Sequence, residues 1–250
     1  FVVHPGKPLL DLFDVFRKKS RVPVPNLISC QRTSPGPGSI RWIGSSRSNA
    51  AHDIWTGPVH IDHQWASVSL KKTFEHPVVV AGPCSMNGNH PGVVRIRNVT
   101  CSGFEIRMQE FEYLDGHHCQ ETVGFLVMET GNYLLSDGTH IEAGTFQTQA
   151  MATSPDTVSL VSNFDQPPVI LSSVGTCNGP SAVFGRLKGI SPDSFEYGLQ
   201  EQESNRQIHV QESIGYIAWE PSSGNLAEIT YEAGTISDVT NTWKDVSGKL

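Results

Sequence analysis

Long apolar runs, clustered positive charge and paired cysteine motifs are all missing from this chain of 250 residues. It contains no stretch of about 20 apolar residues, so no membrane-spanning helix is expected. The 18 Lys and Arg against 25 Asp and Glu give a formal net charge of −7, and binding of nucleic acid, which needs clustered basic residues, is not expected. Charged residues make up only 17% of the chain, alongside 23 Gly and 16 Pro, which is typical of a turn-rich β protein.

Signatures of catalysis and of metal binding are missing as well. The sequence has no G-x-S-x-G, no H-E-x-x-H and no phosphate-binding P-loop. A D-x-D-x-D-G calcium loop is absent, and the five cysteines form no C-x-x-C pair that would indicate zinc. We therefore expect no enzymatic activity, no metal site and no cofactor.

What the chain does have is an internal repeat. Residues 74–129 and 164–220 share an aromatic-x-x-Pro start, an apolar run, an Asn-Gly pair, an arginine, a Gln-Glu-x-Glu cluster and an apolar segment ending in glutamate. The two arginines, Arg95 and Arg186, are 91 positions apart. An internal period defines the unit of folding, and a unit of this size is long enough to bury a core of its own.

Within each unit, apolar and polar residues alternate as they do in β-strands. Phe104, Ile106 and Met108 alternate with polar residues, so one face of that strand is expected to be core. Residues 78–81 are continuously apolar, as in a strand buried on both faces. We predict an all-β protein of two tandem small antiparallel β-sandwiches, each with about six strands, preceded by an irregular N-terminal segment.

The repeat also predicts domain boundaries. Residues 1–56, with a short helix expected at 8–19, are an N-terminal arm, a linker or the end of a preceding domain. The sandwiches are placed at 57–143 and 144–233. Because the tetrapeptide Glu-Ala-Gly-Thr recurs 90 positions later, we expect 234–250 to begin a further repeat or to form a C-terminal arm of a longer protein.

The directions of the predicted strands limit which cysteines can form a disulfide. Cys84 follows one predicted strand, the next strand places Cys101 at the opposite end of the sandwich, and the third brings Cys119 back. A strand of ten residues spans about 33 Å, whereas a disulfide needs Cα atoms within about 7 Å. We therefore predict a Cys84–Cys119 disulfide that contributes about 3–4 kcal/mol, and assign no partner to Cys30, Cys101 or Cys177.

Three polar features recur in both units, and each has two interpretations. The Asn-Gly pair, which begins at Asn87 in the first unit, is typical of a turn. Arg95 is interpreted as an exposed charge on a strand. Glu110, Glu112 and Glu121 are interpreted as solvated glutamates that pair with arginines. The sharper alternatives for the three carboxylates are calcium binding and the acid–base pair of a glycosidase, although no segment supplies a deep cleft.

Two local signals complete the residue-level analysis. Asn98-Val99-Thr100 is a sequon, so Asn98 is a candidate for N-glycosylation. His117 and His118 fall in a predicted turn and are expected to be exposed, without a role.

Taken together, the repeated residues resemble the H-type lectin domain of the snail-agglutinin and discoidin C-terminal type. The resemblance covers residues 57–131 and 147–222. In the first unit it is carried by Trp65, Phe74-x-x-Pro77-Val78-Val79-Val80, Arg95, Val99-Thr100-x-x-Gly103-Phe104, Phe111 and Val123-x-Phe125-Leu126-Val127-x-Glu129. It implies six-stranded antiparallel sandwiches that form trimers and bind galactose or N-acetylgalactosamine at subunit edges.

The resemblance also implies a sugar site. Its arginine falls at Arg95 and Arg186, and its Trp-His pair falls at Phe111-Glu112 and at Gln202-Glu203. Phe111 is able to stack on a sugar ring and Gln202 is not, so the first unit is the better candidate. The expected carbohydrate-binding residues are Arg95, Phe111, Glu112, Asn87, Arg186 and Glu203.

Two functions remain open at this point. The first is a non-catalytic, extracellular or cell-surface, carbohydrate-binding and adhesion array, in which repetition adds avidity. The second is a structural subunit of an extracellular fibre or surface appendage, self-associating as a trimer or a filament through terminal arms that add a strand to a neighbouring sheet.

Overall fold

A computed structural model describes residues 46–47, 53–203, 205–226 and 229–235. Cys30, the helix expected at 8–19 and most of the two terminal segments lie outside this range. The described residues form sixteen strands and no helix, so the prediction of an all-β protein is confirmed. None of these segments is therefore a helix with the length and hydropathy that a bilayer crossing requires.

The first sandwich consists of two antiparallel sheets of three strands each. One sheet has the order β2-β7-β4 and the other β3-β6-β5. The strands are β2 (Ile54–Ile61), β3 (Ala66–Ser69), β4 (Pro77–Cys84), β5 (Gly92–Thr100), β6 (Gly103–Glu110) and β7 (Glu121–Glu129).

The second sandwich repeats this arrangement and extends one of its sheets. The strands β9-β14-β11 face β10-β13-β12, and β8 and β1 continue the first of these sheets at the β9 edge. The strands are β1 (Ser46–Arg47), β8 (Gly131–Leu134), β9 (His140–Thr148), β10 (Asp156–Ser159), β11 (Val169–Val174), β12 (Val183–Lys188), β13 (Ser194–Glu201) and β14 (Glu212–Trp219). Because β1 pairs in parallel with β8, the described end of the N-terminal arm adds a strand to a sheet of its own chain.

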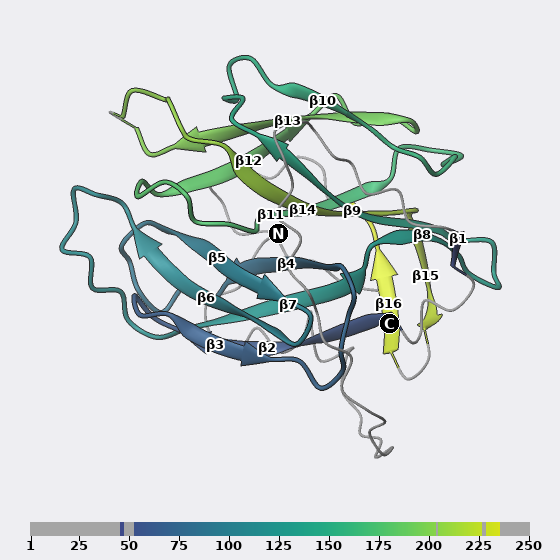
Figure 1. Ribbon diagram of the computed structural model, residues 1–250, viewed down its shortest axis with the longest axis horizontal. Coiled ribbons are helices and arrows are strands. Elements are labelled where there is room, and N and C mark those ends of the chain that lie inside the picture. Colours follow the sequence, from purple (N-terminus) through teal and green to yellow (C-terminus); the bar gives the residue numbers. More distant parts are fainter. Residues whose placement is uncertain (1–45, 48–52, 204, 227–228, 236–250) are drawn as a thin grey trace.

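A hairpin of β15 (Ser222–Leu226) and β16 (Ile229–Ala233) follows the second sandwich. Figure 1 shows the second sandwich above the first, with this hairpin at the right beside both. The β15–β16 hairpin is paired in the same way as β8 and β9. Ala143 pairs with Gly131, and Ala233 pairs with Ser222.

The domain boundary predicted at 143/144 lies inside β9, and the chain passes from the first sandwich to the second at Thr130, between β7 and β8. Sequence period gives the length of a unit but not the residue at which it begins.

Each sandwich encloses its own apolar core, formed by alternate residues of its strands. Val79, on β4, points into the first core, and Ile170, on β11, points into the second. Fully buried side chains of this size contribute about 1.5–3 kcal/mol each. The first core includes Ile61, Phe74, Ile96, Phe104, Ile106, Val123, Phe125 and Val127, and the second includes Val158, Val183, Phe195, Tyr197, Leu199, Ile214 and Tyr216.

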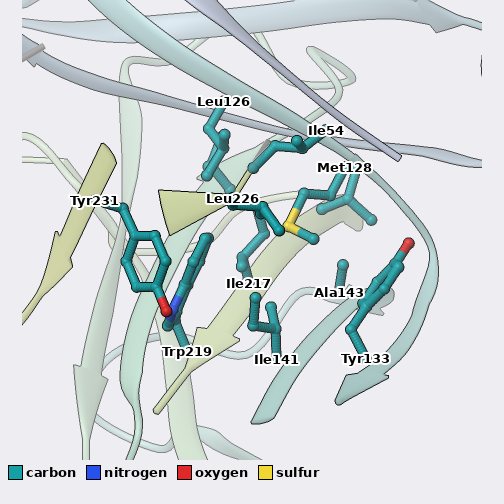
Figure 2. Close-up of a cluster of buried hydrophobic side chains, with 12 residues drawn as sticks. Ile54, Leu126, Met128, Tyr133, Ile141, Ala143, Ile217, Trp219, Leu226 and Tyr231 are labelled. Carbon is teal, nitrogen blue, oxygen red and sulfur yellow. The ribbon is translucent and has the colours of Figure 1, made fainter. Parts of the chain in front are cut away.

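A third core joins the two sandwiches. The outer face of the β2-β7-β4 sheet packs on the outer face of the β9-β14-β11 sheet, and the β15–β16 hairpin closes one side. Figure 2 shows the rings of Trp219 and Tyr231 lying against each other, with their centroids 4.8 Å apart. The cluster consists of Ile54, Val78, Val80, Leu126, Met128, Tyr133, Ile141, Ala143, Ile217, Trp219, Leu226 and Tyr231.

The two middle sheets are therefore buried on both faces. Val78, Val79 and Val80 are 0%, 3% and 5% exposed, which agrees with the prediction made from their continuous apolar run. A Cβ atom on Gly215 would lie 3.0 Å from the carbonyl oxygen of Val79, so glycine permits the close approach of β14 to β4. The two sandwiches, as far as the structure describes them, thus form four sheet layers with three cores between them.

Candidate functional site

A buried glutamate organises the Asn-Gly turn of the second sandwich. The backbone N–H groups of Asn178 and Gly179 donate to Glu212 Oε1 over 3.0 and 3.2 Å, and the Thr176 hydroxyl donates to Oε2 over 2.5 Å. His209 Nε2 lies 3.0 Å from Oε1. A buried charge is tolerated only when it is paired and hydrogen-bonded, and this carboxylate meets both conditions.

The first sandwich carries the same arrangement around Glu121. Asn87 and Gly88 donate their backbone N–H groups to Glu121 Oε1 over 3.0 and 2.8 Å, Ser85 donates its hydroxyl to Oε2 over 2.5 Å, and His118 Nε2 lies 3.2 Å from Oε1. Asn87 itself is an exposed turn residue, and its side-chain amide donates to the Gln120 carbonyl over 2.9 Å.

Each histidine also reaches a second glutamate. His118 Nδ1 lies 3.0 Å from Glu110 Oε1, and His209 Nδ1 lies 2.7 Å from Glu201 Oε1. For His209, burial acts to lower the pKa, but the hydrogen bonds to Glu212 and Glu201 outweigh burial and raise it. An imidazole that donates from both nitrogens carries a positive charge. Burial likewise acts to raise the pKa of Glu212, and the hydrogen bonds that it accepts lower the pKa instead.

Two expectations from the sequence are wrong here. His118, expected to be exposed, is 4% exposed, and Glu110 and Glu121, expected to be solvated, are 5% and 1% exposed. The burial of these polar residues was missed because polar residues next to a turn, considered in one unit alone, are usually solvated. The usable signal was the His-x-x-Glu spacing, which occurs at His118 and again 91 positions later.

Arg95 links the two sandwiches. Its side chain is 0% exposed. One terminal nitrogen lies 3.3 Å from Glu212 Oε1, and the other donates to the Ser181 carbonyl over 2.6 Å. The expectation that Arg95 binds a sugar is therefore wrong in this arrangement, because the second sandwich covers the guanidinium.

Arg186, the counterpart of Arg95, has different surroundings. It is exposed, its Nε donates to Gln200 Oε1 over 2.6 Å, and its guanidinium lies 5.2 Å from the centroid of the Phe184 ring. The same position is therefore an inter-sandwich contact in the first unit and an open surface in the second.

Phe111 and Glu112 come together at a pocket of about 270 Å³ beside the end of β6. The Glu112 N–H donates to Gln202 Oε1 over 2.5 Å, so the second sandwich anchors this wall. Glu203 is exposed on the second sandwich, where it accepts a hydrogen bond from the Tyr113 hydroxyl over 3.4 Å. The pocket is lined by His63, Arg107, Met108, Gln109, Glu110, Phe111, Glu112, Leu114, Asp115 and Gly116.

The expected Cys84–Cys119 disulfide is not formed, because both residues are free thiols. Cys84 ends β4 opposite Val123 and packs against the first core, whereas the Cys119 sulfur lies 3.9 Å from Glu121 Oε1. Strand direction brings the two residues to the same end of the sandwich but does not aim their side chains at each other. Cys177 is a free thiol as well.

Asn98, the glycosylation candidate, is exposed at an irregularity of β5. Its φ of 51° lies in the left-handed region, which asparagine tolerates better than most residues. Its side-chain amide donates to Glu105 Oε2 over 2.6 Å. The surface position is compatible with the prediction, and glycosylation itself stays a prediction.

Comparison with known proteins gives one informative similarity. No family model and no solved structure matches the chain. The chain is 30% identical over 192 residues to Halomucin of Haloquadratum walsbyi (strain DSM 16790 / HBSQ001). The similarity covers 72% of this chain but only 2% of Halomucin, so the chain corresponds to a small part of that protein.

The network of the second sandwich predicts a pH dependence of stability. Glu212, with its pKa lowered from 4.5, contributes stability that is present above about pH 4.5 and lost as the pH falls through its folded pKa. His209, with its pKa raised from 6.5, contributes stability that is present below about pH 6.5 and lost as the pH rises through its folded pKa. The free energy by which wild type exceeds His209→Gln should therefore be largest between these values and smaller at about pH 9, measured by urea unfolding. A difference that does not change with pH would contradict this assignment.

Substitution of the two equivalent arginines should have unequal effects. Arg95→Ala removes a cation from a fully buried pair, and we expect it to lower the free energy of unfolding by about 3–5 kcal/mol. Arg186→Ala, the matched control on the exposed surface, should change it by less than about 0.5 kcal/mol. Chemical denaturation of both variants checks this, and equal effects would refute the inter-sandwich role of Arg95.

Proposed function

We propose that this chain is a non-catalytic, extracellular carbohydrate-binding and adhesion module built from tandem H-type lectin-like sandwiches. The observation that carries the proposal is the pocket of about 270 Å³ that Phe111 and Glu112 line. The resemblance to H-type lectins assigns sugar binding to these two positions. The volume is near the lower end of ligand pockets, about 300 Å³, which suits one sugar residue.

The pocket lining supplies the groups that a neutral sugar needs. Phe111 offers an aromatic face for the apolar side of a pyranose ring. Glu112 and Asp115 are able to accept hydrogen bonds from the sugar hydroxyl groups. Galactose and N-acetylgalactosamine are the proposed ligand class. A single site of this kind binds weakly, since millimolar affinity corresponds to only about 4 kcal/mol.

The wall of the pocket is held in place before any ligand arrives. The Glu112 N–H is fixed by Gln202, and the Gln109 side-chain amide donates to the Pro180 carbonyl over 2.6 Å. Both contacts cross from the first sandwich to the second. A preorganised site loses less conformational entropy on binding, so the inter-sandwich contact supports binding as well as stability.

The extracellular location is part of the proposal. It is supported by the similarity to Halomucin, a mucin by its name, and by the exposed sequon at Asn98. Attachment to a larger protein with many such modules would convert weak single sites into useful avidity.

Removal of the aromatic wall tests the glycan site. Phe111→Ala should lower affinity for galactose or N-acetylgalactosamine at least tenfold, because stacking is lost, as followed by NMR titration at millimolar sugar. Phe184→Ala, which removes a half-buried phenylalanine from the second sandwich, is the matched control and should bind as wild type does. Absence of binding to a panel of simple glycans, or equal affinity for all three proteins, would sink the proposal.

A second candidate function is that of a self-associating structural subunit. It is favoured by Arg186, which is exposed at the position through which Arg95 of the first sandwich contacts the second. This surface is available to dock a further unit of the same kind. If it does so, sedimentation velocity should show concentration-dependent association that Arg186→Ala weakens at least tenfold and that Lys188→Ala, an exposed control on the same strand, leaves intact. A monomer at all concentrations would count against this function.

A further inference from the structure

Glu110 and Glu201 occupy the same position in the two sandwiches but differ in one hydrogen bond. Each is buried at the end of its strand, and each accepts from a histidine through Oε1. Glu201 Oε2 also accepts from the side-chain amide of Asn205 over 3.1 Å. Glu110 Oε2 is buried and has no hydrogen-bond partner among the described residues, and Leu114 stands where the second unit has Asn205.

The groups around Glu110 include two side chains that are also able to bind a metal ion. His90 Nδ1 lies 3.0 Å from Glu110 Oε1, and donor atoms of His90, Glu110 and Asp115 all lie within 4.8 Å of one another. At the positions of His90 and Asp115, the second sandwich has Ser181 and Arg206, so this cluster belongs to the first sandwich alone.

A buried carboxylate oxygen without a hydrogen-bond partner is costly, and a cation bound beside it would satisfy it. His118 does not serve Glu110 Oε2, because its two nitrogens are directed to Glu110 Oε1 and Glu121 Oε1. The Asp115 carboxylate accepts the backbone N–H of His117 over 3.0 Å. This hydrogen bond holds the carboxylate within reach of the ligand atoms of His90 and Glu110.

We propose that His90, Glu110 and Asp115 bind a divalent transition-metal cation of the Zn²⁺ class. One imidazole and two carboxylates match the ligand preference of Zn²⁺, and three protein ligands leave a coordination position for water or another oxygen ligand. Glu110 and Asp115 also line the pocket beside β6, so the cation would face its interior. His90, with its side chain 45% exposed, leaves a route for the ion from solvent.

A second cluster, formed by His118, Cys119 and Glu121, does not carry the same inference. The Glu121 oxygens are occupied by hydrogen bonds from the Asn-Gly turn and from Ser85. Val210 replaces Cys119 in the second sandwich, and the His–Glu arrangement there is unchanged. That cluster is explained by folding alone.

Calorimetric titration of the chelator-treated, dialysed full chain with ZnCl₂ tests the proposal. We expect a saturable site with one ion per chain, and an affinity at least tenfold lower in Asp115→Asn and in His90→Gln. Asp115 is exposed, so its substitution leaves the core intact. His76→Gln is the matched control, because His76 is a half-exposed histidine 3.9 Å from Glu129, and it should bind Zn²⁺ as wild type does.

The inference does not depend on glycan binding, and the titration contains no sugar. Binding that is unsaturable, or that survives both Asp115→Asn and His90→Gln, would overturn it. A complete absence of binding would overturn it as well. Equal affinity for MgCl₂ would contradict the assigned class of ion. The Phe111 experiment follows sugar binding without added metal, so the two proposals can fail independently.

Discussion

The packing of one sheet on another, between sandwiches that each already have a core, is the constraint on which the rest of this structure depends. It explains why both faces of β4 and of β14 are apolar, and why glycine stands at position 215 where the sheets approach most closely. It also explains the burial of Arg95, whose charge is offset by Glu212 of the other sandwich. A solvent-exposed ion pair would contribute little to stability. This pair has both side chains at 0% exposure, so it fixes the position of one sandwich relative to the other.

The duplication provides comparisons within a single molecule. Arg95 and Arg186 share a position, and only the first is covered by a following sandwich. Glu110 and Glu201 share a position, and only the second has both oxygens satisfied among the described residues. The first difference arises because the second sandwich packs against Arg95, and the second arises from a neighbouring side chain, Asn205. A feature retained in both units is thus explained by the fold, and a feature found in one unit is the place to look for function.

The strands could be predicted well from the sequence, whereas the candidate site could not. Period-two alternation, together with the apolar run at 78–81, predicted an all-β chain with a strand buried on both faces, because strand periodicity records which side chains leave water. The same pattern does not say what covers the outer face, so the joining core and the burial of Arg95 were out of reach. His118 was missed for a related reason: a polar residue in a turn looks solvated until its partners, Glu110 and Glu121, are known to be buried.

The central claim is that the two sandwiches unfold as one unit because a shared core and a buried ion pair join them. Differential scanning calorimetry of the wild-type chain measures this most directly. The account predicts a single transition whose calorimetric and van't Hoff enthalpies agree. Two separable transitions, with Arg95→Ala shifting only the one that belongs to the first sandwich, would contradict it.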